Sequence, residues 1–260
     1  MGHDSLNDYR RKRHLGQTPE PAGEGLEGSA EQPRFVVQKH RSRRLHYDLR
    51  LEMEGVLRSW AVPKGPSMDP SEKRLAINVE DHPLEYIDFE GVIPEGEYGA
   101  GQVIVWDQGS YACIGAEVDP VRAWKKGMID FRLYGQKLRG MWLLVKLKKD
   151  ENQWLLFKKQ DAYATAADVT VERPESVISG FEVEEIEEGT LGTWHSRVQR
   201  LLEELQIPPR AIEGEKVRPM LATLVTQVPA DSRWICELKY DGIRALAEKK
   251  TTNSVSIRAT

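Results

Sequence analysis

The most regular pattern of polar and apolar residues runs from Arg44 to Met53, where the two kinds alternate without a break. Successive side chains of a β-strand point to opposite faces, so this pattern predicts a strand with two unlike faces. The apolar face holds Leu45, Tyr47, Leu49, Leu51 and Met53, and the polar face holds Arg44, His46, Asp48, Arg50 and Glu52. We expect the first face to pack in a core and the second to carry an imidazole, a carboxylate and guanidinium groups.

Short apolar or alternating runs, bounded by Gly, Pro, Asp or Asn, recur between residues 34 and about 160. The runs are RFVVQKH, LHYDLRLEME, RLAINVE, GQVIVWD, MIDFRLYG, MWLLVKL and WLLFKK. Many short strands with little helical periodicity predict a mainly β protein, built as a compact β-barrel with short helices. One helix is expected near residues 117–126, because Asp119 and Pro120 are helix start signals.

Changes in composition divide the chain into four regions. Residues 1–33 are polar and rich in Gly, Pro and Glu, which indicates an N-terminal arm. The predicted barrel occupies residues 34–162, and an acidic linker follows over residues 163–214. Apolar residues near a 3.6-residue period predict a helix in this linker at about 193–205. A further apolar region covers residues 215–260.

The composition excludes several classes of protein. Two cysteines, Cys113 and Cys236, are too few for a disulfide framework or a thiolate zinc site, and they fit a reducing cytoplasm. No run approaches the roughly 18 apolar residues of a membrane span. The first residues also lack the apolar segment of a secretion signal. We therefore expect a cytoplasmic protein with no membrane partner.

Charge is unevenly distributed along the chain, although the formal net charge is only −4. Residues 34–50 contain six basic side chains and one acidic one, and YRRKR at residues 9–13 adds four basic side chains. Five glutamates gather at residues 181–189. A basic N-terminal region favours a polyanionic ligand, whereas a solvated charged face is the alternative.

The polar face of the predicted strand also contains candidate metal ligands. His40, His46 and Asp48 supply two imidazoles and a hard carboxylate, a set that suits Mn²⁺, Zn²⁺ or Fe²⁺ and leaves coordination positions for substrate. Arg50, next on the same face, can make a bidentate contact with phosphate. The alternative is an exposed strand whose charged groups form cross-strand ion pairs, because the spacing H-x5-H-x-D is not a closed signature.

Several motifs in this region resemble the 3′-phosphoesterase domain of bacterial DNA ligase D. They are QKHRSRRLHYDLRLE, SWAVPKGPS, EDHPLEYIDFEGVIPEGEYGAG and WLLFKKQD, and the resemblance covers roughly residues 6–162. It implies a compact β-barrel and a Mn²⁺-dependent reaction at DNA 3′ ends, other divalent metals being alternatives. The reaction removes a terminal ribonucleoside and then the 3′-phosphate left behind.

The resemblance also implies roles for individual residues. His40, His46 and Asp48 correspond to the metal ligands. The residues that contact or activate the scissile phosphate correspond to Arg50, Lys64, Arg74, His82 and Tyr86, with His82 as the candidate general acid or base. Arg41, Arg43 and Arg44 are the expected contacts to DNA phosphates.

The arm sequence YRRKRHLGQTPEP resembles the family segment Y-x-x-K-R-D-F-x-x-T-x-E-P. Arg13 and Glu20 occupy positions that matter for activity in the family. His14 departs from the family, because an Asp is usual at this position. An imidazole cannot replace the role of that carboxylate. We therefore expect the arm of this chain to contribute to activity differently from the arm of other family members.

The C-terminal region carries a second resemblance. VRPMLATL at residues 217–224 and WICELKYDGIRA at residues 234–245 resemble the opening of an ATP-dependent DNA ligase, in which a lysine at the position of Lys239 takes the AMP. The alternative for this short motif is a β-hairpin with an Asp-Gly turn. The chain ends 16 residues after Arg244, so we expect an incomplete pocket, no use of ATP and no ligation by this chain.

Three functional hypotheses follow. The first is a metal-dependent DNA 3′-end-processing phosphoesterase that acts in break repair by non-homologous end joining. The second is a non-catalytic module that binds DNA ends or a partner within a repair ligase complex, and the third is a nucleotidyltransferase that depends on Lys239. The family role implies DNA 3′ ends, the Ku protein and ligase or polymerase modules as partners, and a location at the nucleoid.

Overall fold

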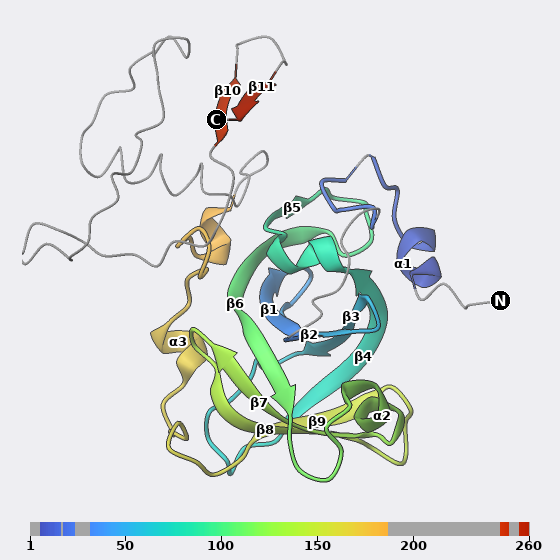
Figure 1. Cartoon of the computed structure of the whole chain (residues 1–260). Helices are drawn as coiled ribbons and strands as arrows, with labels where there is room; N and C mark the ends of the chain where they lie inside the picture. The colour runs from blue at the N-terminus through green and yellow to red at the C-terminus, as the bar shows by residue number, and fades with distance from the viewer. Residues whose placement is uncertain (1–5, 17, 24–31, 187–244, 250–254, 260) are drawn as a thin grey trace, which may run out of the picture. The chain divides into compact units, whose positions relative to one another are not determined.

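The computed structural model describes residues 6–16, 18–23, 32–186, 245–249 and 255–259 (Figure 1). The chain divides into two compact units, Met1–Glu204 and Leu205–Thr260. The described part of the second unit is an antiparallel pair of strands, β10 (Ala245–Lys249) and β11 (Val255–Ala259). The helix expected at 193–205 and the candidate lysine Lys239 lie outside the described residues.

The first unit is a closed antiparallel β-barrel. Its strands are β1 (Arg34–Arg41), β2 (Leu45–Met53), β3 (Val56–Val62), β4 (Arg74–Pro83), β5 (Gly91–Ile93), β6 (Gly101–Cys113), β7 (Met128–Gly135), β8 (Arg139–Lys146) and β9 (Gln153–Lys158). They are ordered β1-β2-β3-β4-β9-β8-β7-β6-β5, and β1 also pairs with β6. This extra pairing closes eight strands into the barrel, while β5 pairs with β6 alone. The predicted mainly β barrel is confirmed.

Short helices accompany the barrel. They are α1 (Asn7–Arg11), η1 (Leu84–Asp88), α2 (Pro120–Lys125), α3 (Val169–Glu172) and η2 (Val183–Glu185). Helix α2 begins as predicted, because the Asp119 carboxylate accepts hydrogen bonds from the backbone N–H groups of Val121 and Arg122 at 2.9 and 3.2 Å. Across the described residues, no helix has the length and apolar character needed to cross a membrane.

The apolar face of β2 packs into the barrel interior. Tyr47, Leu49, Leu51 and Met53 belong to one core cluster that also contains four buried tryptophans, Trp60, Trp106, Trp142 and Trp154. Leu45 is the exception among the alternating apolar residues, with 43% of its surface exposed, because it lies at the start of the strand next to the β1–β2 turn. The alternation of the sequence thus corresponds to a core face and a polar face of β2.

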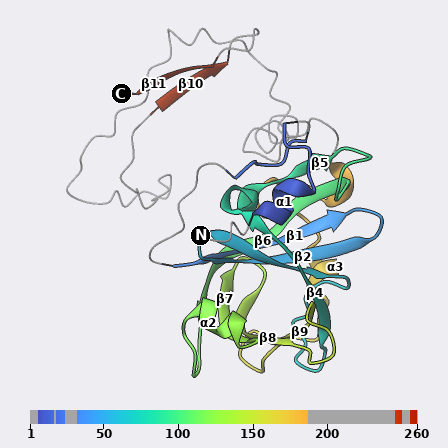
Figure 2. The same cartoon turned by 90° about the vertical axis from the view of Figure 1, so that its right-hand side faces the viewer.

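The polar face of the same strands is covered by a second layer. In Figures 1 and 2, α1 and β5 lie on the opposite side of the barrel from β7, β8 and β9. A second apolar cluster joins Tyr9 of the N-terminal arm and Leu84 and Tyr86 of η1 to Val36 and Leu57 of the barrel. Burial of a large apolar side chain stabilises a fold by about 1.5–3 kcal/mol, so this layer holds the arm on the barrel.

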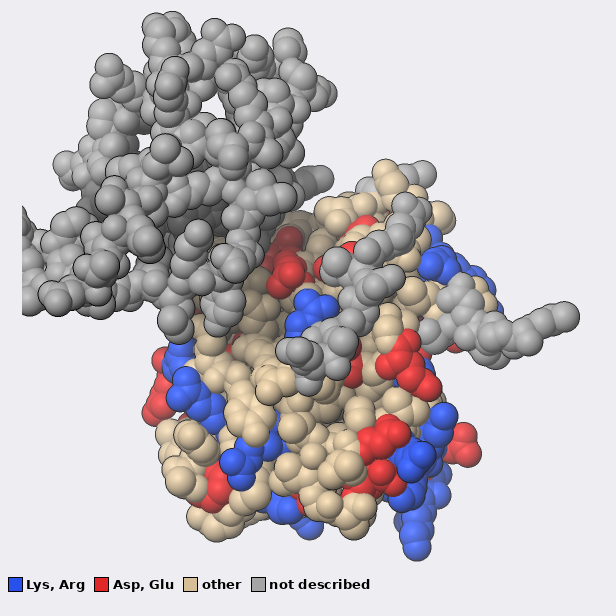
Figure 3. All heavy atoms as spheres, viewed as in Figure 1, with Lys and Arg blue, Asp and Glu red and all other residues tan. Residues whose placement is uncertain are grey.

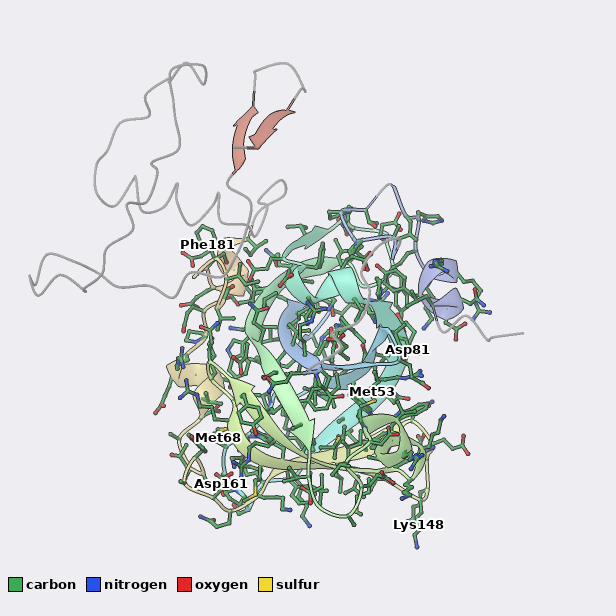
Figure 4. All side chains as sticks on the ribbon, in the orientation of Figure 1. Met53, Met68, Asp81, Lys148, Asp161 and Phe181 are labelled. Carbon is green, nitrogen blue, oxygen red and sulfur yellow. The ribbon has the colours of Figure 1, made fainter. Side chains whose placement is uncertain are left out.

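Residues that follow β9 also pack against the barrel, as far as Ile186. Val183 and Ile186 are buried against Ile104 of β6. The Lys137 ammonium, in the β7–β8 turn, donates a hydrogen bond to the Arg173 carbonyl at 2.8 Å. The first part of the region expected to be a linker therefore adds to the barrel surface; Phe181 and Asp161, labelled in Figure 4, mark its course.

The β7–β8 turn depends on one buried carboxylate, Asp107 of β6. It accepts hydrogen bonds from the backbone N–H groups of Gln136, Lys137 and Leu138 at 2.9, 3.0 and 2.7 Å. We expect Asp107→Ala to lower the free energy of unfolding by about 3 kcal/mol, because buried N–H groups would lose their acceptor. Asp150→Ala is the control in chemical denaturation, because the Asp150 carboxylate accepts from a backbone N–H group, that of Asn152 at 2.9 Å, at an exposed turn. Equal effects of the two substitutions would contradict the assignment.

Candidate metal centre and active site

Three candidate ligands converge where β1 and β2 pair next to their connecting turn. His40 pairs directly with His46 in the antiparallel register, and the two ring centroids are 4.7 Å apart. The Asp48 oxygens lie 3.7 Å from His40 Nδ1 and 3.6 Å from His46 Nε2. All three ligand atoms lie within 4.8 Å of one another, and a side-chain shift of less than about 1 Å would bring them within the roughly 4.2 Å that bonds of about 2.1 Å to one ion require.

Hydrogen bonds orient both imidazoles for this task. His40 donates from Nε2 to the Gly99 carbonyl at 2.8 Å, and His46 donates from Nδ1 to the Arg44 carbonyl at 2.9 Å. A carbonyl oxygen only accepts, so these nitrogens carry protons, and in the neutral imidazole, which is the form that binds a metal ion, the other ring nitrogens keep their lone pairs. The lone pairs are on the nitrogens nearest Asp48. Metal-binding histidines typically have this arrangement, in which the second nitrogen donates to a carbonyl, so the three residues fit a divalent ion.

Asp48 is the buried carboxylate of the cluster. Burial by itself raises the pKa of Asp48, but the charges around it, first that of the Arg50 guanidinium, outweigh burial and hold the pKa well below its ordinary value. The carboxylate is therefore ionised throughout the physiological range. An ionised carboxylate is the form that binds a metal ion.

Arg50 is buried beside Asp48 and is held at a fixed orientation. Its Nε donates to Gln38 at 2.8 Å, one terminal nitrogen donates to Ser59 at 2.8 Å, and the other donates to Asp48 at 3.1 Å. The guanidinium also lies 4.9 Å from the centre of the Tyr86 ring. These contacts use three of its five N–H donors, which leaves two for an anion.

Gln38 and Ser59 were not identified from the sequence, although Gln38 lies opposite Asp48 and Ser59 lies opposite Arg50, both on the polar face.

The N-terminal arm brings a second charged group to the same face. The Arg13 guanidinium lies 2.8 Å from Glu20, 3.1 Å from Glu80 and 3.1 Å from His82 Nε2. Tyr86 donates from its hydroxyl to Glu20 at 3.0 Å. Arg13, Glu20, His82 and Tyr86 are thus in direct contact, as residues of one site must be. Glu80 was missed, although it lies two residues before His82 in β4 and alternation along this strand could have identified it.

His82 is neutral in this environment. Burial lowers the pKa of His82 well below 6.5, and the positive charges of Arg50 and Arg13 lower it further. His82 donates a hydrogen bond from Nδ1 to the Glu80 carbonyl at 3.0 Å. Its Nε2 therefore keeps a lone pair, which is directed at Arg13. Ser59 links this group to the metal cluster, because its hydroxyl lies 3.4 Å from His82 Nδ1 and accepts from Arg50.

Lys64 and Arg74 lie apart from this centre. They line a separate hollow with Glu72 and Lys73, and Arg74 is paired with Glu72. A β-bulge explains the position of Arg74: Ser59 pairs with Val79 but Leu57 pairs with His82, so β4 has one extra residue there. The bulge reverses the alternation, which places His82 on the polar face and Arg74 on the core face.

The expected DNA contacts and His14 lie at the rim of the site. Arg41, Arg43 and Arg44 are exposed around the β1–β2 turn, immediately beside the two histidine ligands. The surface in Figure 3 shows acidic and basic side chains interspersed, so the basic turn is a local feature. His14 is exposed, and its Nδ1 lies 3.0 Å from a Glu97 oxygen.

Comparison with known proteins relates this site to a family. Residues 38–146 match the family of the DNA ligase D 3′-phosphoesterase domain. Over 252 residues the chain is 45% identical to the multifunctional non-homologous end joining protein LigD of Pseudomonas aeruginosa, covering 93% of this chain and 29% of that protein. The LigD protein of Mycolicibacterium smegmatis is 43% identical over 162 residues, covering 61% of this chain and 21% of that protein. The LigD protein of Mycobacterium bovis is 35% identical over 246 residues, covering 94% of this chain and 26% of that protein.

The chain therefore spans less than a third of the length of the curated relatives that it matches. Two of these alignments cover more than nine-tenths of the chain, so the similarity extends beyond the barrel.

We expect Mn²⁺ to raise the thermal unfolding midpoint of the wild-type protein, because an ion that binds only the folded state at 100 times its Kd adds about 2.7 kcal/mol of stability. His46→Ala should lose most of this increase, since it removes one of the three ligands. Thermal unfolding with and without Mn²⁺ measures both. His14→Ala is the matched control, because His14 is an exposed histidine outside the cluster. An undiminished increase in His46→Ala would exclude His46 as a ligand.

Proposed function

Residues 38–146 of this chain belong to the family of the DNA ligase D 3′-phosphoesterase domain, and on this premise we propose that the chain is a divalent-metal-dependent hydrolase of DNA 3′ ends. It removes a terminal ribonucleoside from a DNA strand and then the 3′-phosphate left behind, with Mn²⁺ as the cofactor. The observation that carries this proposal is the convergence of His40, His46 and Asp48, with both imidazole lone pairs on the side of the carboxylate.

The surrounding residues can bind and orient a phosphate. A divalent ion at the cluster supplies Lewis-acid polarisation of a phosphoryl oxygen when it is bound. The two remaining N–H donors of Arg50 bind the phosphate beside Asp48 and neutralise charge that develops in the transition state. The contacts with Gln38 and Ser59 hold the guanidinium in place before substrate arrives, so little reorganisation accompanies the reaction.

His82 acts as a base in this proposal. It is neutral, so its Nε2 can accept a proton once the hydrogen bond that this nitrogen accepts from Arg13 at 3.1 Å opens. Glu20 offsets the charge of Arg13, and Tyr86 donates to the same carboxylate. The arm thus contributes to the site by fixing the position and the charge state of His82.

The exposed basic residues bind the rest of the DNA strand. Arg41, Arg43 and Arg44 neutralise backbone phosphates next to the metal cluster and read no sequence. Lys64 and Arg74 contact phosphates further from the scissile bond, because they lie in a separate hollow.

The wider role follows from the relatives, whose names describe multifunctional proteins of non-homologous end joining. We propose that this chain processes 3′ ends during that kind of break repair. Such a role implies the Ku protein and ligase and polymerase modules as partners, and a location at the nucleoid.

The direct test uses a 5′-labelled primer on a template, ending in one 3′-ribonucleotide, incubated with Mn²⁺. We expect the wild-type protein to shorten the primer to a 3′-phosphate end and then to a 3′-hydroxyl end. His46→Ala should lower both rates by more than a hundredfold, since it removes a metal ligand. Product analysis on a sequencing gel measures each step. Tight binding of the primer end without any product would instead support a non-catalytic end-binding module.

The pH dependence tests the role of His82. Because its pKa lies well below 6.5, the neutral base persists at mildly acidic pH, and the rate should fall only when the pH approaches the lowered pKa. We expect kcat/KM to stay level as the pH decreases through 6.5. Arg13→Gln should move the acid limb to higher pH, because loss of this positive charge raises the pKa of His82. An acid limb that does not move would exclude this electrostatic coupling.

A further inference from the structure

One exposed aromatic ring lies at the edge of the metal centre and has no part in the mechanism above. Tyr98 lies in the loop between β5 and β6, and 46% of its surface is exposed. The carbonyl of the next residue, Gly99, accepts the hydrogen bond from His40 that orients this candidate ligand. The main chain at Tyr98 is therefore anchored to the metal centre on one side.

The N-terminal arm contacts the same ring from the other side. The Lys12 ammonium lies 4.8 Å from the centre of the Tyr98 ring and 3.3 Å from its hydroxyl. The Arg13 guanidinium lies 5.3 Å from the ring centre, and the same guanidinium contacts His82 at 3.1 Å. The loop that carries Tyr98 thus contacts both groups of residues that make up the candidate active site, through its main chain at Gly99 and through the Tyr98 ring.

The charges around Tyr98 differ from those around the β1–β2 turn. Near the ring, Lys12 and Arg13 pair with Glu20 and Glu80, and Glu97 lies beside His14, so the positive side chains there are matched by carboxylates. At the turn, Arg41, Arg43 and Arg44 lie close together in the sequence, and the Arg41 guanidinium is 3.5 Å from Glu184. On one side of the scissile bond the DNA strand continues with a phosphate at every nucleotide. On the other side the terminal nucleoside carries no further phosphate. The strand fits the basic turn, and the terminal nucleoside fits the side of Tyr98.

We propose that Tyr98 is the platform on which the base of the terminal nucleoside stacks while that nucleoside is removed. Stacking on an exposed aromatic ring binds any base through its π-face, which suits an enzyme that accepts ends of any sequence. The inference rests on the proposed function and adds to it a binding site for the leaving nucleoside. The contact with Lys12 holds the ring, and the bond between the Gly99 carbonyl and His40 holds the loop, before the DNA end binds.

The test combines a change in the protein with a change in the substrate. Primers that end in a 3′-ribonucleotide with a normal base are compared with primers that end in an abasic ribose. For the wild-type protein, kcat/KM should be about tenfold higher with the base present. In Tyr98→Ala this ratio should fall to about one, while Tyr98→Phe should keep it because the ring remains. Tyr134→Ala is the matched control, an exposed tyrosine of β7 with 53% of its surface accessible.

A purely structural role of Tyr98 gives a different result. If the ring only fastens the arm to the loop, Tyr98→Ala slows both substrates equally, and a ratio that stays near tenfold would overturn the proposal. A wild-type ratio near one would also overturn it.

A second readout does not depend on turnover. A primer with 2-aminopurine as its 3′-terminal base is titrated with protein in the absence of metal. Stacking should quench its fluorescence with wild type and with Tyr98→Phe but not with Tyr98→Ala. If the wild-type protein turns over neither substrate, the proposed function fails, and this quenching alone decides the assignment of Tyr98: equal quenching by wild type and Tyr98→Ala overturns it.

Discussion

The buried ion pair between Asp48 and Arg50 is the interaction on which the site depends. Neither charge is stable in a barrel wall without a partner, because an isolated buried charge costs several kcal/mol. Asp48 and Arg50 lie two and four residues beyond His46 on the same face of β2. Their contact orients the carboxylate toward the imidazoles and the guanidinium toward Ser59 and Gln38. A strand that would otherwise be an ordinary wall element thereby holds a preorganised polar centre.

The barrel supports this centre by separating its two faces. The core side packs four buried tryptophans and makes the strands rigid, while the polar side is enclosed by η1 and the N-terminal arm. Enclosure excludes water from around Arg50 and His82, and it strengthens each electrostatic contact there. The same enclosure keeps His82 neutral, so the fold determines the chemistry available to this side chain.

The arm reaches the polar centre through Arg13 and Glu20, while the His14 ring stays at the surface and contacts Glu97. Arg13 and Glu20 reach the buried network because Tyr9, on which the Arg13 guanidinium packs, is fully buried and its hydroxyl donates to the Pro21 carbonyl at 2.7 Å. In the described part of the chain, the anchoring of the arm therefore involves Tyr9, Arg13 and Glu20 and not His14.

The sequence by itself determined the β-barrel class and the two faces of β2, which place His46, Asp48 and Arg50 on one side, because alternation with period two is a local property that any strand must follow. Only the tertiary structure decided which distant residues join that set. Contacts of Arg13 and Ser59 with His82 span 69 and 23 positions along the chain and leave no periodic signal. The bulge in β4 likewise cannot be read from alternation, and its single extra residue turns His82 toward the centre and Arg74 away from it.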